Sequence, residues 1–253
     1  MTTQRGDLLK RLLLSTPDKG VVCAAYLTKH GFSYDNIKNY IRSGYLDQLG
    51  RGAYCKHGSK PDVAAAVAAL NHQLSLSVHV GGKTALAEHG FLHFVPFQEL
   101  PTMLFAPPKV SLPVWFSRFY ASSFALTRTN FLPDGEGVEQ RQFGESSVWM
   151  SVPERAILEL LHGVPEKQMI NEAYQILEMM TVVRPKFMQT LLQECSSVKV
   201  KRLFFLLAER TGHSWFEDLD QSKIDFGSGC RVIEEGGTFN SKWQLVVKDW
   251  SEI

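Results

Sequence analysis

Amide and cationic side chains gather on one face of a short amphipathic segment, residues 33–44. Ile37, Tyr40 and Ile41 fall at helical spacing and would form the buried face of a helix. The opposite face then carries two amides and two cations, namely Asn36, Lys38, Asn39 and Arg42. Amides can form hydrogen bonds with base edges and cations can bind phosphates, so this face has the chemistry of a nucleic-acid contact.

The residues at both ends of this segment define a helix followed by a hairpin. Ser33 can cap the helix by accepting from a free backbone N–H, and Gly44 permits a left-handed stop. Residues 45–54 then have the pattern of a short β-hairpin, and its turn contains Arg51 between two glycines. We therefore predict a recognition helix that enters the major groove and a wing with Arg51 at its tip. Ser33 and Tyr34 would contact the DNA backbone at the start of the helix.

Two earlier helices would hold the recognition helix in place. Residues 7–14 are amphipathic, residues 17–20 form a turn, and residues 23–30 form a second helix that Gly31 ends. The order helix, turn, helix, tight turn, helix and hairpin is that of a winged helix-turn-helix domain. Other small helical domains with a hairpin could show the same order, so the distribution of charge has to support the interpretation.

Charge is strongly segregated along the chain. Residues 1–60 hold ten lysine and arginine residues against four aspartates, a net charge of +6, whereas residues 61–253 carry a net charge of −5. A basic module is the electrostatic footprint expected for binding a polyanion. We therefore predict an α+β protein with a winged helix-turn-helix DNA-binding domain over residues 1–58 and a larger mixed α/β domain over residues 61–253.

Composition argues against several other classes of protein. The longest apolar run, residues 63–70, is far shorter than the ~20 residues of a membrane helix. No signal-peptide cleavage site follows the N-terminal leucines. We therefore expect a cytoplasmic protein without a membrane partner. The four cysteines are too widely spaced for a C-x-x-C metal site. His89 and His93 are four residues apart but lack the H-E-x-x-H pattern. We predict no metal and no cofactor.

Two motifs suggest an enzyme, but each has a structural interpretation. Gly82-Lys83-Thr84 resembles the end of a phosphate-binding loop, yet Ser77 stands where that motif needs glycine, which favours a tight turn from a strand at residues 78–80 into a helix. Glu154 has the spacing of a capping box with Ser151. We predict no catalytic residues and no enzyme. A nucleotide-binding enzyme that uses the Gly82 turn, and a protein-interaction module without DNA binding, stay open as alternatives.

The rest of the chain should be a β region, then helices, then a small terminal sheet. Strands are expected at residues 102–106, 114–116, 124–128, 138–143 and 147–150. Four helices should follow, the first starting at residue 151 and the others at residues 167–180, 185–194 and 198–209. The last would carry Lys199, Lys201 and Arg202 outward as a solvated face or a weak second nucleic-acid contact. Terminal strands are expected at residues 223–225, 230–233 and 243–247.

Four segments together resemble the AbiE-type abortive-infection antitoxins, the antitoxin half of a bacterial type IV toxin–antitoxin pair. The matching segments are residues 43–54 (SGYLDQLGRGAY), 79–86 (HVGGKTAL), 151–156 (SVPERA) and 224–229 (IDFGSG), the last with Gly236, Gly237 and Trp243. They occur in the family's order and span nearly the whole chain.

The resemblance implies an N-terminal winged helix that represses its own operon at inverted repeats in promoter DNA. It also implies a larger C-terminal antitoxin domain that opposes a nucleotidyltransferase-like toxin without forming a stable complex with it. DNA-binding residues carry over only at the helix and wing, as Ser33, Tyr34, Asn36, Lys38, Asn39, Arg42 and Arg51. No functional residue of the C-terminal half carries over.

Overall fold

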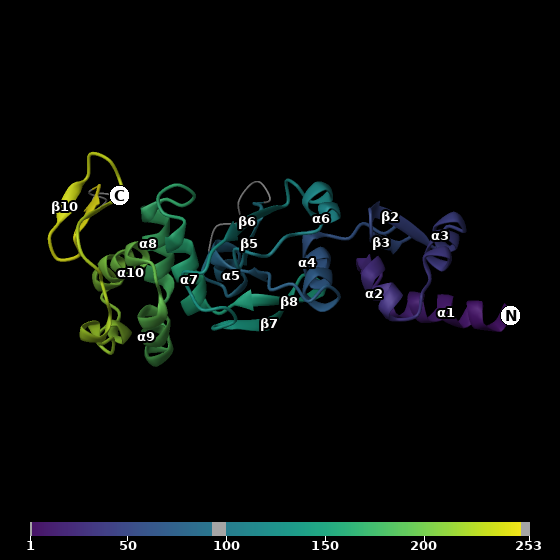
Figure 1. Cartoon of the computed structure of the whole chain (residues 1–253). Coiled ribbons are helices and arrows are strands. Elements are labelled where there is room, and N and C mark those ends of the chain that lie inside the picture. Colours follow the sequence, from purple (N-terminus) through teal and green to yellow (C-terminus); the bar gives the residue numbers. More distant parts are fainter. Residues whose placement is uncertain (1, 93–99, 249–253) are drawn as a thin grey trace. The chain divides into compact units, whose positions relative to one another are not determined.

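A computed structural model describes residues 2–92 and 100–248 of the chain (Figure 1). The chain divides into two compact units. The first unit contains Met1–His79, Leu100–Arg128 and Gln140–Trp149, and the second contains Val80–Glu99, Thr129–Glu139 and Met150–Ile253. The mixture of helices and sheets confirms the predicted α+β class. The division at residues 58–61 remains a prediction, because the compact units include segments from several parts of the chain.

The first unit begins with the predicted helices and hairpin. Its elements are α1 (Thr2–Ser15), β1 (Val22–Cys23), α2 (Ala24–Lys29), α3 (Tyr34–Arg42), β2 (Leu46–Gly50) and β3 (Ala53–Lys56). The sequence pattern did not predict β1, which pairs antiparallel with β3 and places Val22 opposite Tyr54. The sheet order is β1-β3-β2, so β1 and β2 are the edge strands.

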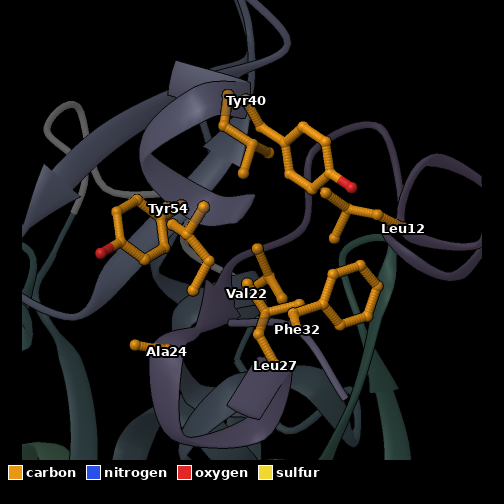
Figure 2. Close-up of a cluster of buried hydrophobic side chains, with 9 residues drawn as sticks. Leu12, Val22, Ala24, Leu27, Phe32, Tyr40 and Tyr54 are labelled. Carbon is orange, nitrogen blue, oxygen red and sulfur yellow. The ribbon is translucent and has the colours of Figure 1, made fainter. Parts of the chain in front are cut away.

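Each of these elements contributes side chains to a single apolar core (Figure 2). Leu12 of α1, Leu27 of α2, Tyr40 of α3 and Tyr54 of β3 are all buried there. Burial of a large apolar side chain contributes roughly 1.5–3 kcal/mol. Because the core draws on every helix and on the hairpin, it fixes the orientation of α3 within this module.

The remainder of the first unit includes α4 (Val63–His72), β5 (Thr102–Ala106), α6 (Val114–Phe119) and β6 (Phe124–Arg128). Strands β5 and β6 have the predicted bounds and pair in parallel. Asp62 caps α4 by accepting from the Ala65 N–H at 2.8 Å, so Pro61 lies before the helix and not in its first turn.

The strand expected at residues 114–116 is wrong, because this segment begins helix α6. Trp115 and Phe116 are both buried, although they are adjacent in sequence. In a strand, adjacent side chains point to opposite faces, whereas one broad face of a helix can bury both. Pro113 precedes the helix, and its carbonyl accepts from the Phe116 N–H at 3.0 Å.

The winged helix is tied to the rest of the first unit at two points. The Gln73 side chain accepts from the Cys23 N–H at 2.8 Å and donates to the Val21 carbonyl at 2.7 Å, so it pairs with the open edge of β1. At the hairpin turn, Gly50 packs on α6, and a Cβ atom at this position would lie 2.8 Å from the Trp115 Cβ. The second contact therefore requires glycine.

Strands β4 (His79–Val80), β7 (Val138–Phe143) and β8 (Ser146–Ser151) each have residues in both units. Within the second unit, Val80 pairs in parallel with Met150. The helices of this unit are α5 (Gly82–Glu88), α7 (Pro153–His162), α8 (Ile170–Met179), α9 (Pro185–Glu194) and α10 (Val198–Thr211). The four helices predicted after residue 151 are thus confirmed.

The chain then forms η1 (Ser214–Phe216), η2 (Gln221–Lys223), β9 (Arg231–Val232), β10 (Thr238–Asn240) and β11 (Leu245–Val247). The small terminal sheet is confirmed, with the order β10-β11-β9, but its strand β10 was not predicted. The strand expected at residues 223–225 is wrong. Lys223 ends a short 3₁₀ helix that Asp220 caps by accepting from the Ser222 N–H at 3.1 Å.

Candidate nucleic-acid interface

Helix α3 begins and ends as the sequence predicts. The Ser33 Oγ accepts from the Asn36 N–H at 3.2 Å, and Gly44 adopts a φ of +71° after the last turn. Asp35 lies in the first turn and Arg42 in the last, where each charge is favourable with respect to the helix dipole. The local sequence therefore specifies where this helix begins and ends.

The two predicted faces of α3 are present. Ile37 and Tyr40 are buried, and Ile41 packs partly buried against the same core. On the other face, Lys38, Asn39 and Arg42 are exposed, whereas Asn36 is only partly exposed. Two further predicted contact residues, Ser33 and Tyr34, are exposed at the start of the helix. The structure thus presents all the predicted residues of this helix on its surface, and their contact with DNA remains a prediction.

Asn36 is part of the helix cap as well as of the exposed face. Its Oδ1 accepts a hydrogen bond from the Ser33 Oγ at 2.9 Å. A bidentate contact with adenine needs both the oxygen and the nitrogen of an amide, so it would have to break this bond. A contact that uses only the Nδ2 donor would not. The sequence contained a signal for this bond, because a polar residue three positions after the cap can bond back to it.

The wing is a short hairpin whose turn consists of Arg51 and Gly52. Gly52 adopts a φ of +88°, and its carbonyl accepts from the Ala24 N–H at 2.8 Å. Arg51 is exposed at this turn. Because Gly50 packs on Trp115, the turn lies beside α6 and does not extend away from the first unit. Of the two glycines predicted to shape the turn, only Gly52 has a positive φ.

The cations of α3 and the wing differ from those elsewhere in the basic module. Across residues 2–92 and 100–248, Lys38, Arg42 and Arg51 form no ion pair and no side-chain hydrogen bond. In contrast, Lys56 binds Asp18 at 2.7 Å and holds the pKa of that carboxyl below its usual value. Lys19 similarly binds Glu145 at 2.5 Å. The cations available to a polyanion therefore include those of α3 and the hairpin turn.

Carboxylates occupy the positions where the Gly82 turn would hold a phosphate. The Gly82 N–H donates to the buried carboxylate of Glu159 at 3.0 Å, and Lys83 forms an ion pair with Glu172. An anionic ligand would have to displace Glu159, which also accepts from Ser151 and Arg155. This geometry is that of a structural turn and argues against the nucleotide-binding alternative.

The predicted capping box at the start of α7 is wrong. Ser151 donates to Glu159 at 2.8 Å, and Val152 occupies the cap position without a side-chain hydrogen bond. The Glu154 carboxylate binds the Arg184 guanidinium at 2.8 and 2.9 Å and the Arg184 N–H at 3.0 Å. Burial acts to raise the pKa of Glu154, but the bonds from Arg184 hold it below its ordinary value. Glu154 thus has a structural role as the partner of Arg184.

The basic residues of α10 do not face outward as predicted. Lys201 and Arg202 are buried, and the Lys199 amine donates to the carbonyls of His162 and Val164 at 2.9 and 2.6 Å. The Arg202 guanidinium donates to four carbonyls, those of Phe226, Gly227, Gly229 and Gln244. A glycine-containing loop provides most of these acceptors, which is why the cation is buried. A second nucleic-acid contact at this site is therefore overturned.

The histidines and cysteines in the described part of the chain do not form a metal site. The His89 ring lies 3.0 Å from the Ser151 carbonyl, and His93 lies outside the described residues. Cys23, Cys55 and Cys195 are buried and Cys230 is exposed, all as free thiols. Within residues 2–92 and 100–248, no group of three His, Cys, Asp or Glu residues is placed to hold a metal. None of the helices in these residues has a hydrophobic stretch that could span a lipid bilayer.

Family models match both the winged helix and the region that follows it. Residues 6–97 match the transcriptional regulator, AbiEi antitoxin N-terminal domain. Residues 101–248 match the transcriptional regulator, AbiEi antitoxin, type IV TA system. The chain therefore belongs to the AbiEi antitoxin family of type IV toxin–antitoxin transcriptional regulators, as the sequence predicts.

A solved structure has the same fold. The RV2827C protein from Mycobacterium tuberculosis matches with a TM-score of 0.65 and 16% sequence identity, over 96% of this chain and 91% of that chain. At this identity the similarity establishes the fold alone. No curated protein matches the chain.

Two of the family-like segments have a shared structural role. The Gly82 N–H of one segment and the Ser151 Oγ of another both donate to Glu159, and Arg155 donates to the same carboxylate at 2.8 Å. A buried carboxylate with three donors needs each of them, because an unsatisfied buried charge is costly. These segments therefore stabilise the second unit and do not by themselves form a ligand site.

Proposed function

We propose that this protein is the antitoxin and autoregulatory repressor of a type IV toxin–antitoxin operon, and that it binds inverted repeats in its promoter through α3 and the wing. The observation that carries the proposal is the exposed face of α3, where Lys38 and Arg42 have no acidic partner among the described residues. Membership of the AbiEi antitoxin family supports it independently. We place the protein in the cytoplasm, where this DNA is found.

The residues would divide into two kinds of contact. Asn39, and Asn36 through its Nδ2 group, would read base edges in the major groove. Lys38, Arg42 and Arg51 would bind phosphates or a groove, and Ser33 and Tyr34 would contact the backbone at the start of α3. Base contacts should determine sequence preference, whereas phosphate contacts should determine affinity and its dependence on salt.

The experiment that tests DNA binding is a fluorescence-anisotropy titration of the full-length protein. The DNA upstream of its own gene should bind about 1,000-fold or more tightly than scrambled DNA of the same length. Affinity should fall linearly with salt on logarithmic axes, because bound phosphates release counterions. Equal affinity for the two duplexes would contradict sequence-specific repression.

Single substitutions separate the two kinds of contact. Lys38→Gln should weaken binding to both duplexes and lower the salt slope by about one unit. Asn39→Ala should weaken binding to upstream DNA by about 1–3 kcal/mol and leave binding to scrambled DNA nearly unchanged. Lys186→Gln is the matched control, because Lys186 is an exposed cation of the second unit. It should change neither quantity.

The second part of the proposal is functional opposition to a nucleotidyltransferase-like toxin without a stable complex. Co-expression should restore growth, while the two proteins should elute separately in size-exclusion chromatography. Co-elution of a stable complex by a protein without DNA affinity would instead favour an interaction module. An enzymatic role is not proposed, and calorimetry with nucleoside triphosphates should detect no binding at the Gly82 turn, where Glu159 holds the backbone N–H.

A further inference from the structure

Basic residues of the first unit extend beyond the winged helix. The segment of residues 100–128 contains Lys109, Arg118 and Arg128 and has no aspartate or glutamate. Counted over the whole first unit, fourteen lysine and arginine residues face six acidic residues, a net charge of +8. The second unit has a net charge of −7. The boundary between basic and acidic regions therefore follows the compact units and not residue 60.

The three cations of this segment are available to a ligand. Lys109, Arg118 and Arg128 are all exposed. Within the described parts of the chain, Lys109 and Arg118 form no ion pair or side-chain hydrogen bond. The Arg128 Nε donates to the Val110 carbonyl at 3.0 Å, which holds this guanidinium next to the loop that carries Lys109. Without acidic residues in the segment, their positive potential is not cancelled locally.

Contacts within the first unit place Arg118 near the wing. A Cβ atom on Gly50 would lie 3.2 Å from the Trp115 Cα, so the backbones of the hairpin turn and α6 are in contact. Arg118 follows Trp115 by three residues, a rise of about 4.5 Å along the helix. Arg51 is one residue from Gly50, a Cα separation of about 3.8 Å. Two exposed arginines thus emerge from adjoining backbone segments on two different elements.

We propose that the DNA interface continues from the winged helix onto α6 and the loop before it. Arg118 binds a phosphate next to the one contacted by Arg51, and Lys109 and Arg128 bind the backbone of the flanking duplex. The partner is double-stranded DNA outside the base pairs that α3 reads. These contacts add affinity without sequence preference, since phosphates carry no base information. The inference rests on the proposed function of α3.

The test measures salt dependence with the full-length protein and a duplex that extends well beyond the operator. Arg118→Gln should lower the slope of log affinity against log salt by about one unit, and Lys109→Gln with Arg128→Gln by about two. The ratio of affinities for upstream and scrambled DNA should stay unchanged. On a duplex trimmed to the operator, the Lys109 and Arg128 variant should bind like the unmodified protein.

Two controls distinguish failure of this inference from failure of the proposed function. Lys186→Gln should leave the slope unchanged, whereas Lys38→Gln should lower it. If Lys38→Gln lowers the slope and Arg118→Gln and the double variant do not, the extended interface is wrong and the role of α3 stands. If Lys38→Gln also has no effect, the proposed DNA contact of α3 itself fails. All substituted side chains are exposed, and thermal melting confirms that each variant is folded.

Discussion

Helices α3 and α10 both carry clustered basic residues, but they use them in opposite ways. On α3, Lys38 and Arg42 are exposed and have no acidic partner within the described residues. On α10, Arg202 is 3% exposed and its guanidinium donates to four backbone carbonyls. An arginine is therefore a candidate ligand contact on α3, whereas on α10 it stabilises the fold through hydrogen bonds to the backbone.

Nearby hydrogen-bond acceptors, more than local sequence, therefore determine whether a basic side chain is buried. Burying an arginine is costly unless its donors find acceptors. The loop that follows η2 provides them to Arg202, and it is further fixed by the Asp225 carboxylate, which accepts from the Gly227 N–H at 2.8 Å. No comparable set of carbonyls surrounds the cations of α3 among the described residues.

Substitution of Arg202 should destabilise the protein most. Arg202→Gln removes a buried guanidinium that donates to four backbone carbonyls, and it should reduce the free energy of unfolding by about 3 kcal/mol or more. Urea denaturation measures this loss. The matched control is Arg231→Gln, because Arg231 is exposed and, among the described residues, its side chain donates only to the neighbouring Cys230 carbonyl. If Arg202→Gln weakened DNA binding without changing stability, the assignment of opposite roles to the two helices would be wrong.

A smaller effect is expected at the Glu154–Arg184 pair. Glu154→Gln should reduce stability at pH 7 by about 1–2 kcal/mol, discounted because the Arg184 side chain is 61% exposed. Since the bonds from Arg184 hold the pKa of folded Glu154 below its ordinary value of 4.5, the pair stabilises the protein above that pH. Its contribution is lost as pH falls through the lower, folded pKa.

To test this pH dependence, the free energy of unfolding is measured for the unmodified protein and for Glu154→Gln between pH 3 and 7, at intervals of about half a pH unit. The difference between them should shrink as the solution becomes more acidic than the unfolded pKa. A difference that stays constant across this range would mean that Glu154 stabilises the fold by packing and not by charge.

Ser33→Ala should lower the stability of the protein moderately and should also change its preference among DNA bases. Loss of the cap should cost about 1 kcal/mol, and it also releases the Asn36 Oδ1 from its bond with Ser33. We therefore expect a lower melting temperature together with altered base preference in a binding-site selection experiment. Ser43→Ala is the control, since Ser43 is exposed at the other end of α3. An unchanged base preference would argue that Asn36 does not read bases.

The smallest effect on stability is expected at Arg42. Arg42→Gln removes an exposed cation and should change the free energy of unfolding by less than about 0.5 kcal/mol. Its affinity for upstream DNA should nonetheless fall, with a salt slope lower by about one unit. Calorimetry and anisotropy on the same preparation provide the two values. Stability losses as large as those of Arg202→Gln would remove the contrast between the helices.

Regular patterns made much of the fold predictable. Periodic apolar residues gave the observed bounds of α9 and of strands β5 and β6, and the cap and glycine stop gave those of α3. The segment at Trp115 and Phe116 was assigned to the wrong element, because two adjacent buried aromatics fit a short strand as well as a helix until their neighbours are known. Strand β1 was missed, since two residues carry no periodicity.

The buried and exposed faces of α3 could be predicted from the sequence, but the tertiary contacts of the basic residues and of the wing could not. Helical spacing separates Ile37 and Tyr40 from Lys38 and Arg42 without any knowledge of tertiary structure. The burial of Arg202 depends on a carbonyl 24 residues further along the chain, which no local pattern reveals. Likewise, the contact between Gly50 and Trp115 brings together segments that are distant in sequence.

The bonds from Gln73 to β1 limit how the winged helix can be exchanged during evolution. A winged helix severed after residue 60 would lack the acceptor for the Cys23 N–H and the donor for the Val21 carbonyl. Its sheet would then have an open edge, which invites pairing with another chain. Recombination between regulators of this family should therefore keep this edge covered only when the crossover lies beyond Gln73, so that the winged helix is inherited together with the residue that pairs with β1.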